Sequence, residues 1–325
     1  MRDRLSPSPK TYFLVSVVAL VALTVIVFTG AAVRVTGSGL GCPSWPNCYE
    51  NGRLIAETDT HSMIEFGNRM LTSFVGLAAA AAGLLAFLRR PFRRDLAILG
   101  SLLPLGVVAQ AVLGGLTVWY GLAPGYVMGH YALSMVILVA AGALVWRARP
   151  AFDDHPAPPA DRATARAVWA MFALGAVTIV VGTASTAAGP HAGGSGTGDV
   201  VHRLDFRGGE TLSWLIHRHG WLATALGLLA VGTWWLARRR GADADLRSRL
   251  TRICVLMAVQ GVVGILQYRL ELPAEVVWIH VALATLTWVG IVLAAVQVGS
   301  PRRAPAGAGA LSAAGAGGAP ASAAR

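Results

Sequence analysis

Eight long apolar runs alternate with short polar segments along this chain of 325 residues. Each run has roughly 20 or more residues, the length that a helix needs to cross a hydrocarbon layer of about 30 Å. The pattern therefore predicts an all-α integral membrane protein with eight transmembrane helices. The predicted spans cover residues 12–34, 62–88, 96–119, 124–146, 165–187, 211–237, 249–270 and 274–298.

Basic residues gather in every second loop between these spans. The chain is 55% apolar and 13% charged, with a formal net charge of +11. In a soluble protein that charge would suggest nucleic acid, but here it follows the positive-inside rule, which places arginine-rich loops in the cytoplasm. We therefore expect a cell-membrane protein with both termini in the cytoplasm, in contact with lipid and not with nucleic acid. The main clusters are Arg89, Arg90, Arg93 and Arg94; Arg147, Arg149, Arg162 and Arg166; and Arg238, Arg239, Arg240, Arg247 and Arg249.

The spans and the segments between them divide the chain into five parts. Residues 1–11 form a cytoplasmic N-terminus, 12–146 a first four-helix half, 147–164 a cytoplasmic linker, 165–298 a second four-helix half and 299–325 a tail. The tail is rich in Ala, Gly and Pro and has almost no large apolar side chains, so we expect it to be disordered. The first span lacks a small-residue cleavage site, so we expect it to stay as a membrane helix.

The two halves match each other at several positions. Gln110 precedes His130 by twenty residues, and Gln260 precedes His280 by twenty. A parallel repeat with an even number of helices keeps its orientation in the bilayer, so equivalent residues lie at equal depth. We therefore predict two pseudo-symmetric four-helix bundles. The superposition also pairs Gly30 with Gly182, Gly37 with Gly189, Asn68 with His217 and Arg69 with Arg218.

Three histidines lie at a similar depth near the outer ends of their predicted helices. His130, His217 and His280 are each about six residues inside, which is roughly 9 Å. Polar nitrogens are costly inside a bilayer, so a functional role is the default hypothesis. Two imidazoles of one half, His217 and His280, could hold a haem iron from both sides. The alternative is hydrogen bonding across helices, and His219, two positions from His217, is expected to face elsewhere.

The first half is the asymmetric one, because Asn68 stands where the second half has His217. An asparagine is a poor ligand for haem iron, so His130 could be a lone ligand there. A haem with one protein ligand suits a reacting or substrate haem, whereas two ligands suit electron transfer. His61, near the start of the second span, is a weaker candidate for the missing ligand.

Glu65 lies three residues before Asn68 and therefore on the same face of its helix. A carboxylate at that depth is costly unless it serves proton transfer or charge stabilisation. The alternative is a structural ion pair with Arg69 at the favourable i, i+4 spacing.

Cys42 and Cys48 lie in the first outer loop, on the side of the membrane where disulfides persist. We expect a disulfide between them, which either staples the loop or exchanges with a redox partner. The chain has no Walker-type phosphate loop, no dinucleotide fingerprint and no Cys-x-x-Cys-His signature, so any haem would be held noncovalently.

The combination of motifs resembles the haem A synthase family over about residues 12–298. The resemblance rests on TGSGLGCPSWPNC, IEFGNR, QAVLGGLTV before His130, the GPHAG turn, the HR pair at His217 and Arg218, and His280. It implies oxidation of the methyl group of haem O to the formyl group of haem A for cytochrome oxidase.

The resemblance also implies a set of site residues and partners. Haem b would be held by His217 and His280 in the second half, and substrate haem O would meet His130 and the catalytic Glu65 in the first. The family pattern usually reads Glu-x-x-His-Arg where this chain has Asn68 before Arg69, so one expected ligand of the substrate haem is missing and Asn68 would stand in its place in the substrate haem pocket. Haem O synthase and oxidase assembly factors would be partners, and homo-oligomerisation stays open. The rival functions are a noncatalytic dihaem b-type electron-transfer subunit and a transporter.

Overall fold

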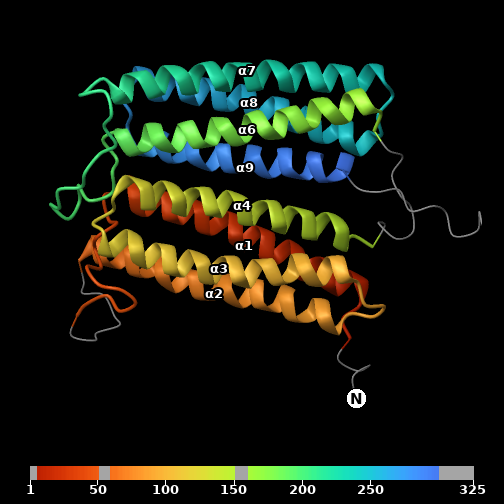
Figure 1. Cartoon of the computed structure of the whole chain (residues 1–325), viewed down its shortest axis with the longest axis horizontal. Helices are drawn as coiled ribbons and strands as arrows, with labels where there is room; N and C mark the ends of the chain where they lie inside the picture. The colour runs from red at the N-terminus through yellow and green to blue at the C-terminus, as the bar shows by residue number, and fades with distance from the viewer. Residues whose placement is uncertain (1–5, 51–58, 151–159, 300–325) are drawn as a thin grey trace, which may run out of the picture.

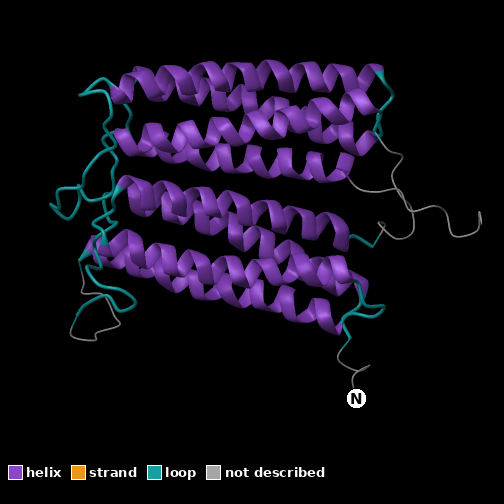
Figure 2. Ribbon diagram, in the orientation of Figure 1, coloured by secondary structure: helices purple, strands orange, loops and turns teal. Residues whose placement is uncertain are grey.

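The computed structural model describes residues 6–50, 59–150 and 160–299. Within these ranges it contains eight long helices and no strand (Figure 1, Figure 2). Each helix is long and apolar enough to cross a membrane, which confirms the predicted all-α, eight-span membrane protein. The helices are α1 (Pro9–Val35), α2 (Thr60–Leu88), α3 (Arg94–Trp119), α4 (Pro124–Ala148), α6 (Arg162–Ala188), α7 (Thr211–Arg239), α8 (Ala244–Arg269) and α9 (Ala274–Gly299).

Several helices extend beyond their apolar runs because polar residues cap them. The side chains of Ser8, Asp59, Asp161 and Asp243 accept hydrogen bonds from first-turn N–H groups of α1, α2, α6 and α8. Such caps satisfy donors that have no partner inside the helix. Helix α8 therefore begins at Ala244, in a polar first turn that hydropathy alone does not include.

The helices form two groups of four, α1–α4 and α6–α9, which lie one above the other in Figure 1. In the first group the contacting neighbours are α1 with α2, α2 with α3, α3 with α4, and α4 with α1. In the second they are α6 with α7, α7 with α8, α8 with α9, and α9 with α6. Helices α2 and α4 thus stand at opposite corners of one group, as α7 and α9 do in the other. The pseudo-symmetric relation between the groups stays a prediction.

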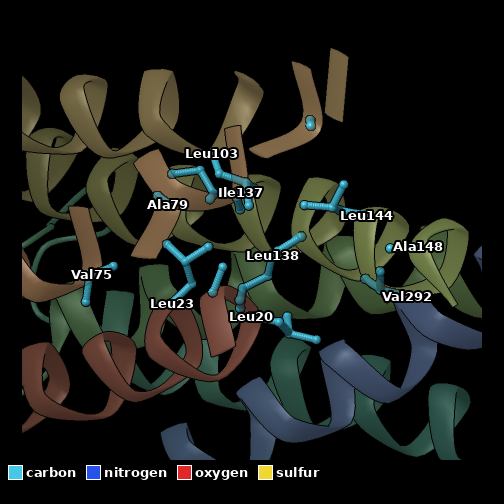
Figure 3. Packing of buried hydrophobic residues seen from close by; sticks show 14 of the residues in the cluster. Leu20, Leu23, Val75, Ala79, Leu103, Ile137, Leu138, Leu144, Ala148 and Val292 are labelled. Carbon is cyan, nitrogen blue, oxygen red and sulfur yellow. The ribbon is translucent and has the colours of Figure 1, made fainter. Parts of the chain in front are cut away.

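The two groups share part of their core where α4 packs against α9. Val292 and Trp288 of α9 belong to the same buried cluster as Leu138 and Leu144 of α4 (Figure 3). The Trp288 indole N–H donates to the Met135 carbonyl at 3.0 Å. A small residue lets the helices approach, because a Cβ at Gly142 would lie 2.8 Å from Val292 Cγ1.

Two glycine-rich loops join the halves at one end of the bundle. The Gly39 N–H donates to the Gly193 carbonyl at 2.8 Å, and the Gly196 N–H donates to the Gly37 carbonyl at 3.2 Å. Gly37 has a positive φ of 70°, and a Cβ there would lie 2.3 Å from the Gly196 nitrogen. Only glycine allows this approach.

Hydrogen bonds of two side chains, Arg34 and His191, stabilise the same junction between the loops. Arg34 of α1 donates from Nε to the His191 carbonyl at 3.0 Å. The ring of His191 is bonded through Nε2 to the Leu272 carbonyl, between α8 and α9, at 2.7 Å. The GPHAG turn therefore links α1 to the α8–α9 connection.

Some predicted segments lie outside the described residues. These are residues 1–5 of the N-terminus, 151–159 of the linker and 300–325 of the tail.

Candidate functional site

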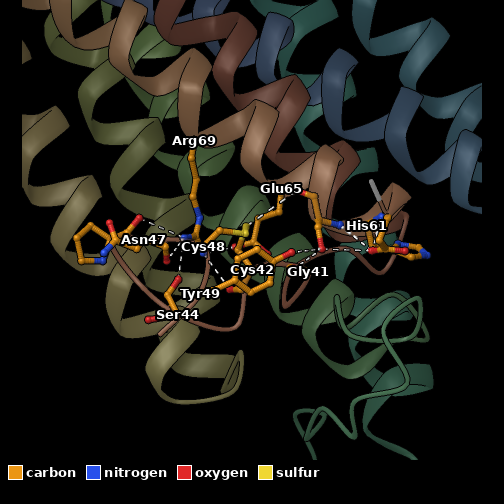
Figure 4. The surroundings of a disulfide bond; sticks show 12 residues. Gly41, Cys42, Ser44, Asn47, Cys48, Tyr49, His61, Glu65 and Arg69 are labelled. Atoms are coloured by element: carbon orange, nitrogen blue, oxygen red, sulfur yellow. Dashed lines mark hydrogen bonds and ion pairs between the residues drawn. A yellow bond between two sulfur atoms is a disulfide. The ribbon is translucent and has the colours of Figure 1, made fainter. Parts of the chain in front are cut away.

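Glu65 lies in the second turn of α2 and is buried, with 6% of its surface exposed. Its Oε2 accepts a hydrogen bond from the Cys42 N–H at 2.8 Å. Its Oε1 forms an ion pair with Arg69 Nη2 at 2.6 Å, as the i, i+4 spacing suggested (Figure 4). The carboxylate is therefore held in one orientation by a backbone N–H on one oxygen and a guanidinium cation on the other.

Arg69 connects this carboxylate to the loop of residues 42–48, which we call the disulfide loop. Its guanidinium donates to the carbonyl of Cys42 at 3.1 Å, of Ser44 at 2.7 Å and of Asn47 at 3.2 Å (Figure 4). A planar guanidinium has five donors in a fixed fork, so one side chain can satisfy several loop carbonyls and Glu65 together. The loop, Arg69 and Glu65 are one hydrogen-bonded unit.

The disulfide between Cys42 and Cys48 is present, as expected from the sequence. Both cysteines are buried, with exposed fractions of 0% and 1%. Exchange needs access to a sulfur atom, so this burial favours the structural staple over exchange with a redox partner. The loop also reaches α3, because a Cβ at Gly115 would lie 3.0 Å from Trp45 Cδ2.

Removing the disulfide should loosen the loop without unfolding the helices. We expect the double substitution Cys42→Ser with Cys48→Ser to lower the free energy of unfolding by about 2 kcal/mol, the loop-closure contribution for so short a loop. Chemical unfolding in detergent measures the change. The free cysteine Cys254, substituted by serine, is the control, and an equal loss there would contradict the assignment.

The start of α2 is fixed by Asp59, which accepts hydrogen bonds from the N–H groups of His61 and Ser62 at 3.1 and 3.0 Å. The Ser62 N–H is the main reason that the pKa of Asp59 lies below its ordinary value, so this cap stays ionised at neutral pH. His61 lies in the loop layer, with Nδ1 2.8 Å from Ser38 Oγ. A Cβ at Gly196 would lie 2.8 Å from His61 Nε2, so the ring packs against the loop of the second half, which weighs against His61 as the missing ligand.

His130 and His280 have matching surroundings. Gln110 Nε2 donates to the His130 carbonyl at 3.0 Å, and Gln260 Nε2 donates to the His280 carbonyl at 3.0 Å. Each glutamine therefore braces the backbone of the histidine that lies twenty residues later. The spacing noticed in the sequence reflects a contact between the two helices of a hairpin.

Both imidazoles face a glycine on the neighbouring helix. A Cβ at Gly114 would lie 3.4 Å from His130 Cε1, and one at Gly264 would lie 3.3 Å from His280 Cε1. The Nδ1 atoms of both histidines are buried and have no hydrogen-bond partner within the described residues. A buried polar atom without a partner is costly, so each ring points to a group that completes the site.

His217 is arranged differently from His280. It is exposed at the surface of α7, and its Nδ1 lies 2.7 Å from the Ser213 carbonyl one turn earlier. When Nδ1–H donates to that carbonyl, Nε2 keeps its lone pair and can bind a metal. The residues around it line a depression of about 460 Å³, formed by Glu210, Ser213, Trp214, His217 and Arg218.

His219 lies on a different face of α7 from the exposed His217, as its position two residues later suggested, but this face turns toward His280. Its ring centroid lies 6.1 Å from that of His280, and its Nδ1 lies 3.1 Å from the Thr178 carbonyl of α6. A Cβ at Gly182 would lie 2.8 Å from His219 Cε1, so that glycine makes room for the ring. Gly182, which the sequence superposition pairs with Gly30, is the signal in the sequence that could have indicated this contact.

Asn68 contacts α1. Its Oδ1 accepts a hydrogen bond from Thr29 Oγ1 at 2.7 Å. Thr29 is 39 residues away in the sequence and carried no motif, so sequence reasoning missed it.

These residues suit a haem group. Two histidines with available nitrogens lie in the second half, and one lies in the first. A Cβ at Gly220 or Gly261 would meet no atom within 4 Å, so there is open space beside α7 and α8. Imidazole nitrogens are common axial ligands of haem iron, and small residues leave room for a flat ring.

The fold and these side chains define a class: a multi-pass membrane protein of eight helices that carries histidines and a buried carboxylate inside its spans. Residues 12–292 match the model of the COX15-CtaA family, described as cytochrome oxidase assembly protein. The chain belongs to this family.

Individual relatives are similar over part of their length. The chain is 34% identical over 124 residues to the Heme A synthase of Listeria welshimeri, which is 37% of this chain and 40% of the relative. It is 32% identical over 127 residues to the Heme A synthase of Lysinibacillus sphaericus, which is 38% of this chain and 41% of the relative. It is 31% identical over 125 residues to the Heme A synthase of Bacillus pumilus, which is 38% of this chain and 40% of the relative. These alignments thus span about two fifths of each relative.

Proposed function

We propose that this protein is a haem A synthase, an oxidoreductase that converts the methyl group of haem O into the formyl group of haem A. The observation that carries the proposal is the matched pair of histidine sites at His130 and His280, each with a buried Nδ1 lacking a partner, in a chain of this family. Heme A synthase relatives, each aligned over part of its length, support the same activity.

The second half would hold a haem b between His217 and His280. The bond to the Ser213 carbonyl would leave Nε2 of His217 available, and the exposed glycines Gly220 and Gly261 would leave room for a flat ring. Haem b, when bound, would supply a site that carries electrons away from the substrate. Helices α7 and α9, which carry the two histidines, stand at opposite corners of their group.

The first half would receive haem O, with His130 as the ligand and Glu65 as the catalytic carboxylate. Oxidation of a methyl group removes protons as well as electrons, so a base or a compensating negative charge is needed close by. Glu65 would accept a proton or stabilise positive charge on the substrate. Its bonds to the Cys42 N–H and to Arg69 hold the carboxylate in place, which limits the reorganisation that catalysis requires.

The arginine-rich loops support an orientation with both termini in the cytoplasm and both haem sites near the outer face. In that orientation the disulfide loop lies outside, where oxidised cysteines persist. The enzyme that makes haem O would supply the substrate, and assembly of cytochrome oxidase would consume the product.

Extraction of haems from cells tests the proposed activity. The full chain is expressed with a haem O source in a host without haem A synthase of its own, and the haems are separated by chromatography. Haem A in these cells, and none in cells with the empty vector, is the expected result. Haem b with unconverted haem O would refute the enzyme and favour the dihaem electron carrier.

Substitution of the α7 histidines tests the ligands of haem b. We expect His217→Ala to abolish the low-spin haem spectrum of the purified protein, because a ligand is lost, and His219→Ala to preserve it. Visible absorption and haem content per chain are the measurements. The reverse result would assign the ligand to His219, whose ring lies beside His280.

A further inference from the structure

Thr29 of α1 orients the side-chain amide of Asn68, because its hydroxyl group donates a hydrogen bond to the amide oxygen. Thr29 Oγ1 lies 2.7 Å from Asn68 Oδ1 and 3.2 Å from the Ile26 carbonyl of its own helix, so the bond to Asn68 is the shorter. One lone pair of the amide oxygen is thereby used, and the oxygen is turned toward α1. Within the described part of the chain, the Nδ2 group of Asn68 has no hydrogen-bond partner, and this half-buried NH₂ remains as a donor.

The second half lacks this arrangement. The sequence superposition that pairs Gly30 with Gly182 places Val181 at the position of Thr29, and Val181 has no hydroxyl group. His217, at the position of Asn68, instead uses the Ser213 carbonyl of its own helix. The threonine and the asparagine therefore occur together in one half, where the other half has valine and histidine.

We propose that Asn68 is a hydrogen-bond donor toward the substrate site, held in that role by Thr29, and is not an iron ligand. The proposal rests on the proposed function. It would leave His130 as the single protein ligand of the substrate iron, since an uncharged amide oxygen is a poor ligand for haem iron and this one is turned toward Thr29 of α1. A haem iron bound there would then keep a position for a small molecule, and the Asn68 NH₂ would donate to such a molecule if it carried an acceptor atom.

This arrangement distinguishes the two haem sites of one chain. A haem iron with two histidine ligands has no free position and suits electron transfer, whereas an iron with one protein ligand can bind an exogenous molecule. The Asn68 donor makes the open position selective for ligands with a hydrogen-bond acceptor. Position 68 thus determines specificity in the first half.

Carbon monoxide and azide are the probes for the experiment. The full chain is purified with both haems, and carbon monoxide binding to the reduced protein is followed by difference spectroscopy. We expect the wild type to bind carbon monoxide at one of its two haems. We expect Asn68→His to lose this binding at least about tenfold and to gain low-spin character, because a second imidazole closes the position.

Two further variants separate the hydrogen bond from the open position. Asn68→Leu should keep carbon monoxide binding but weaken azide binding to the oxidised protein about fivefold, the size of one lost hydrogen bond. Thr29→Val should weaken azide binding in the same direction, because the amide is no longer held. The mirror variant His217→Asn with Val181→Thr should create a second haem that binds carbon monoxide.

The outcomes separate this inference from the proposed function. If His130→Ala leaves the haem content unchanged, the first half holds no haem and the proposed function is wrong. If His130→Ala removes a haem but the wild type binds no carbon monoxide, or Asn68→His binds it as well as the wild type does, the inference about Asn68 is overturned and the enzyme assignment stands. Unchanged azide affinity in Asn68→Leu would likewise overturn the donor role.

Discussion

Replacing Glu65 with glutamine is expected to lower the formation of haem A by at least about a hundredfold, which is the usual contribution of a positioned acid or base. Glutamine has nearly the same shape but no charge, and it cannot accept a proton at neutral pH. Arg69 keeps its carbonyl acceptors at Cys42 and Ser44, so the disulfide loop should stay in place. Haem A per cell and haem b per purified chain are the measurements.

The haem content distinguishes a chemical defect from a folding defect. Retained haem b with lost haem A supports the catalytic role of Glu65. Glu275→Gln, an exposed carboxylate in the first turn of α9, is the matched control and should retain full activity. Normal haem A formation by Glu65→Gln would leave Glu65 with a structural role only.

Replacing Arg69 with methionine is expected to destabilise the protein by roughly 3–5 kcal/mol, the cost of leaving a buried charge without its partner. Glu65 would keep the Cys42 N–H but lose its cation, and carbonyls of the disulfide loop would lose their donor. Thermal and chemical unfolding in detergent measure the loss.

Two comparisons test the reason for that loss. The double variant Arg69→Met with Glu65→Gln should be more stable than Arg69→Met alone, because it removes the unpaired carboxylate. The matched control is Arg218→Met, since Arg218 takes the same position in the second half but is exposed and only lies 5.3 Å from the Trp214 ring centroid. We expect that change to cost less than about 1 kcal/mol. Equal losses at the two arginines would contradict the role of Arg69.

The membrane spans and the features set by residues close in sequence could be predicted from the sequence. A segment of some 20 apolar residues has few alternatives to a helix in a bilayer, since its backbone groups must bond to one another. The eight spans, the disulfide of Cys42 with Cys48 and the pair Glu65 with Arg69 all follow from local spacing. These are features that neighbouring residues determine.

Contacts between distant residues could not be predicted in this way. The direction of a side chain on α7 depends on which helices pack around it, and the sequence contains no record of that choice except Gly182, which makes room for His219. The partner of Asn68 was missed for the same reason, because a threonine in an apolar helix carries no signal of its own. The hydrogen bonds from Arg69 to carbonyls of the disulfide loop could not be predicted either, because they depend on the path of the loop in space.

The junction of the glycine-rich loops bears on the order in which the protein matures during synthesis. Arg34, Gly37 and Gly39 belong to the part of the chain that leaves the ribosome first, yet their partners are residues 191–196. The first four helices therefore enter the bilayer before the junction of the two loops can form. The junction forms only after α6, the fifth span, has been made and residues 191–196 have followed it. If the chain were cut between the halves and produced as two fragments, these hydrogen bonds could form only when the fragments associate. The fraction of assembled protein should then depend on fragment concentration, whereas folding of the unbroken chain should not.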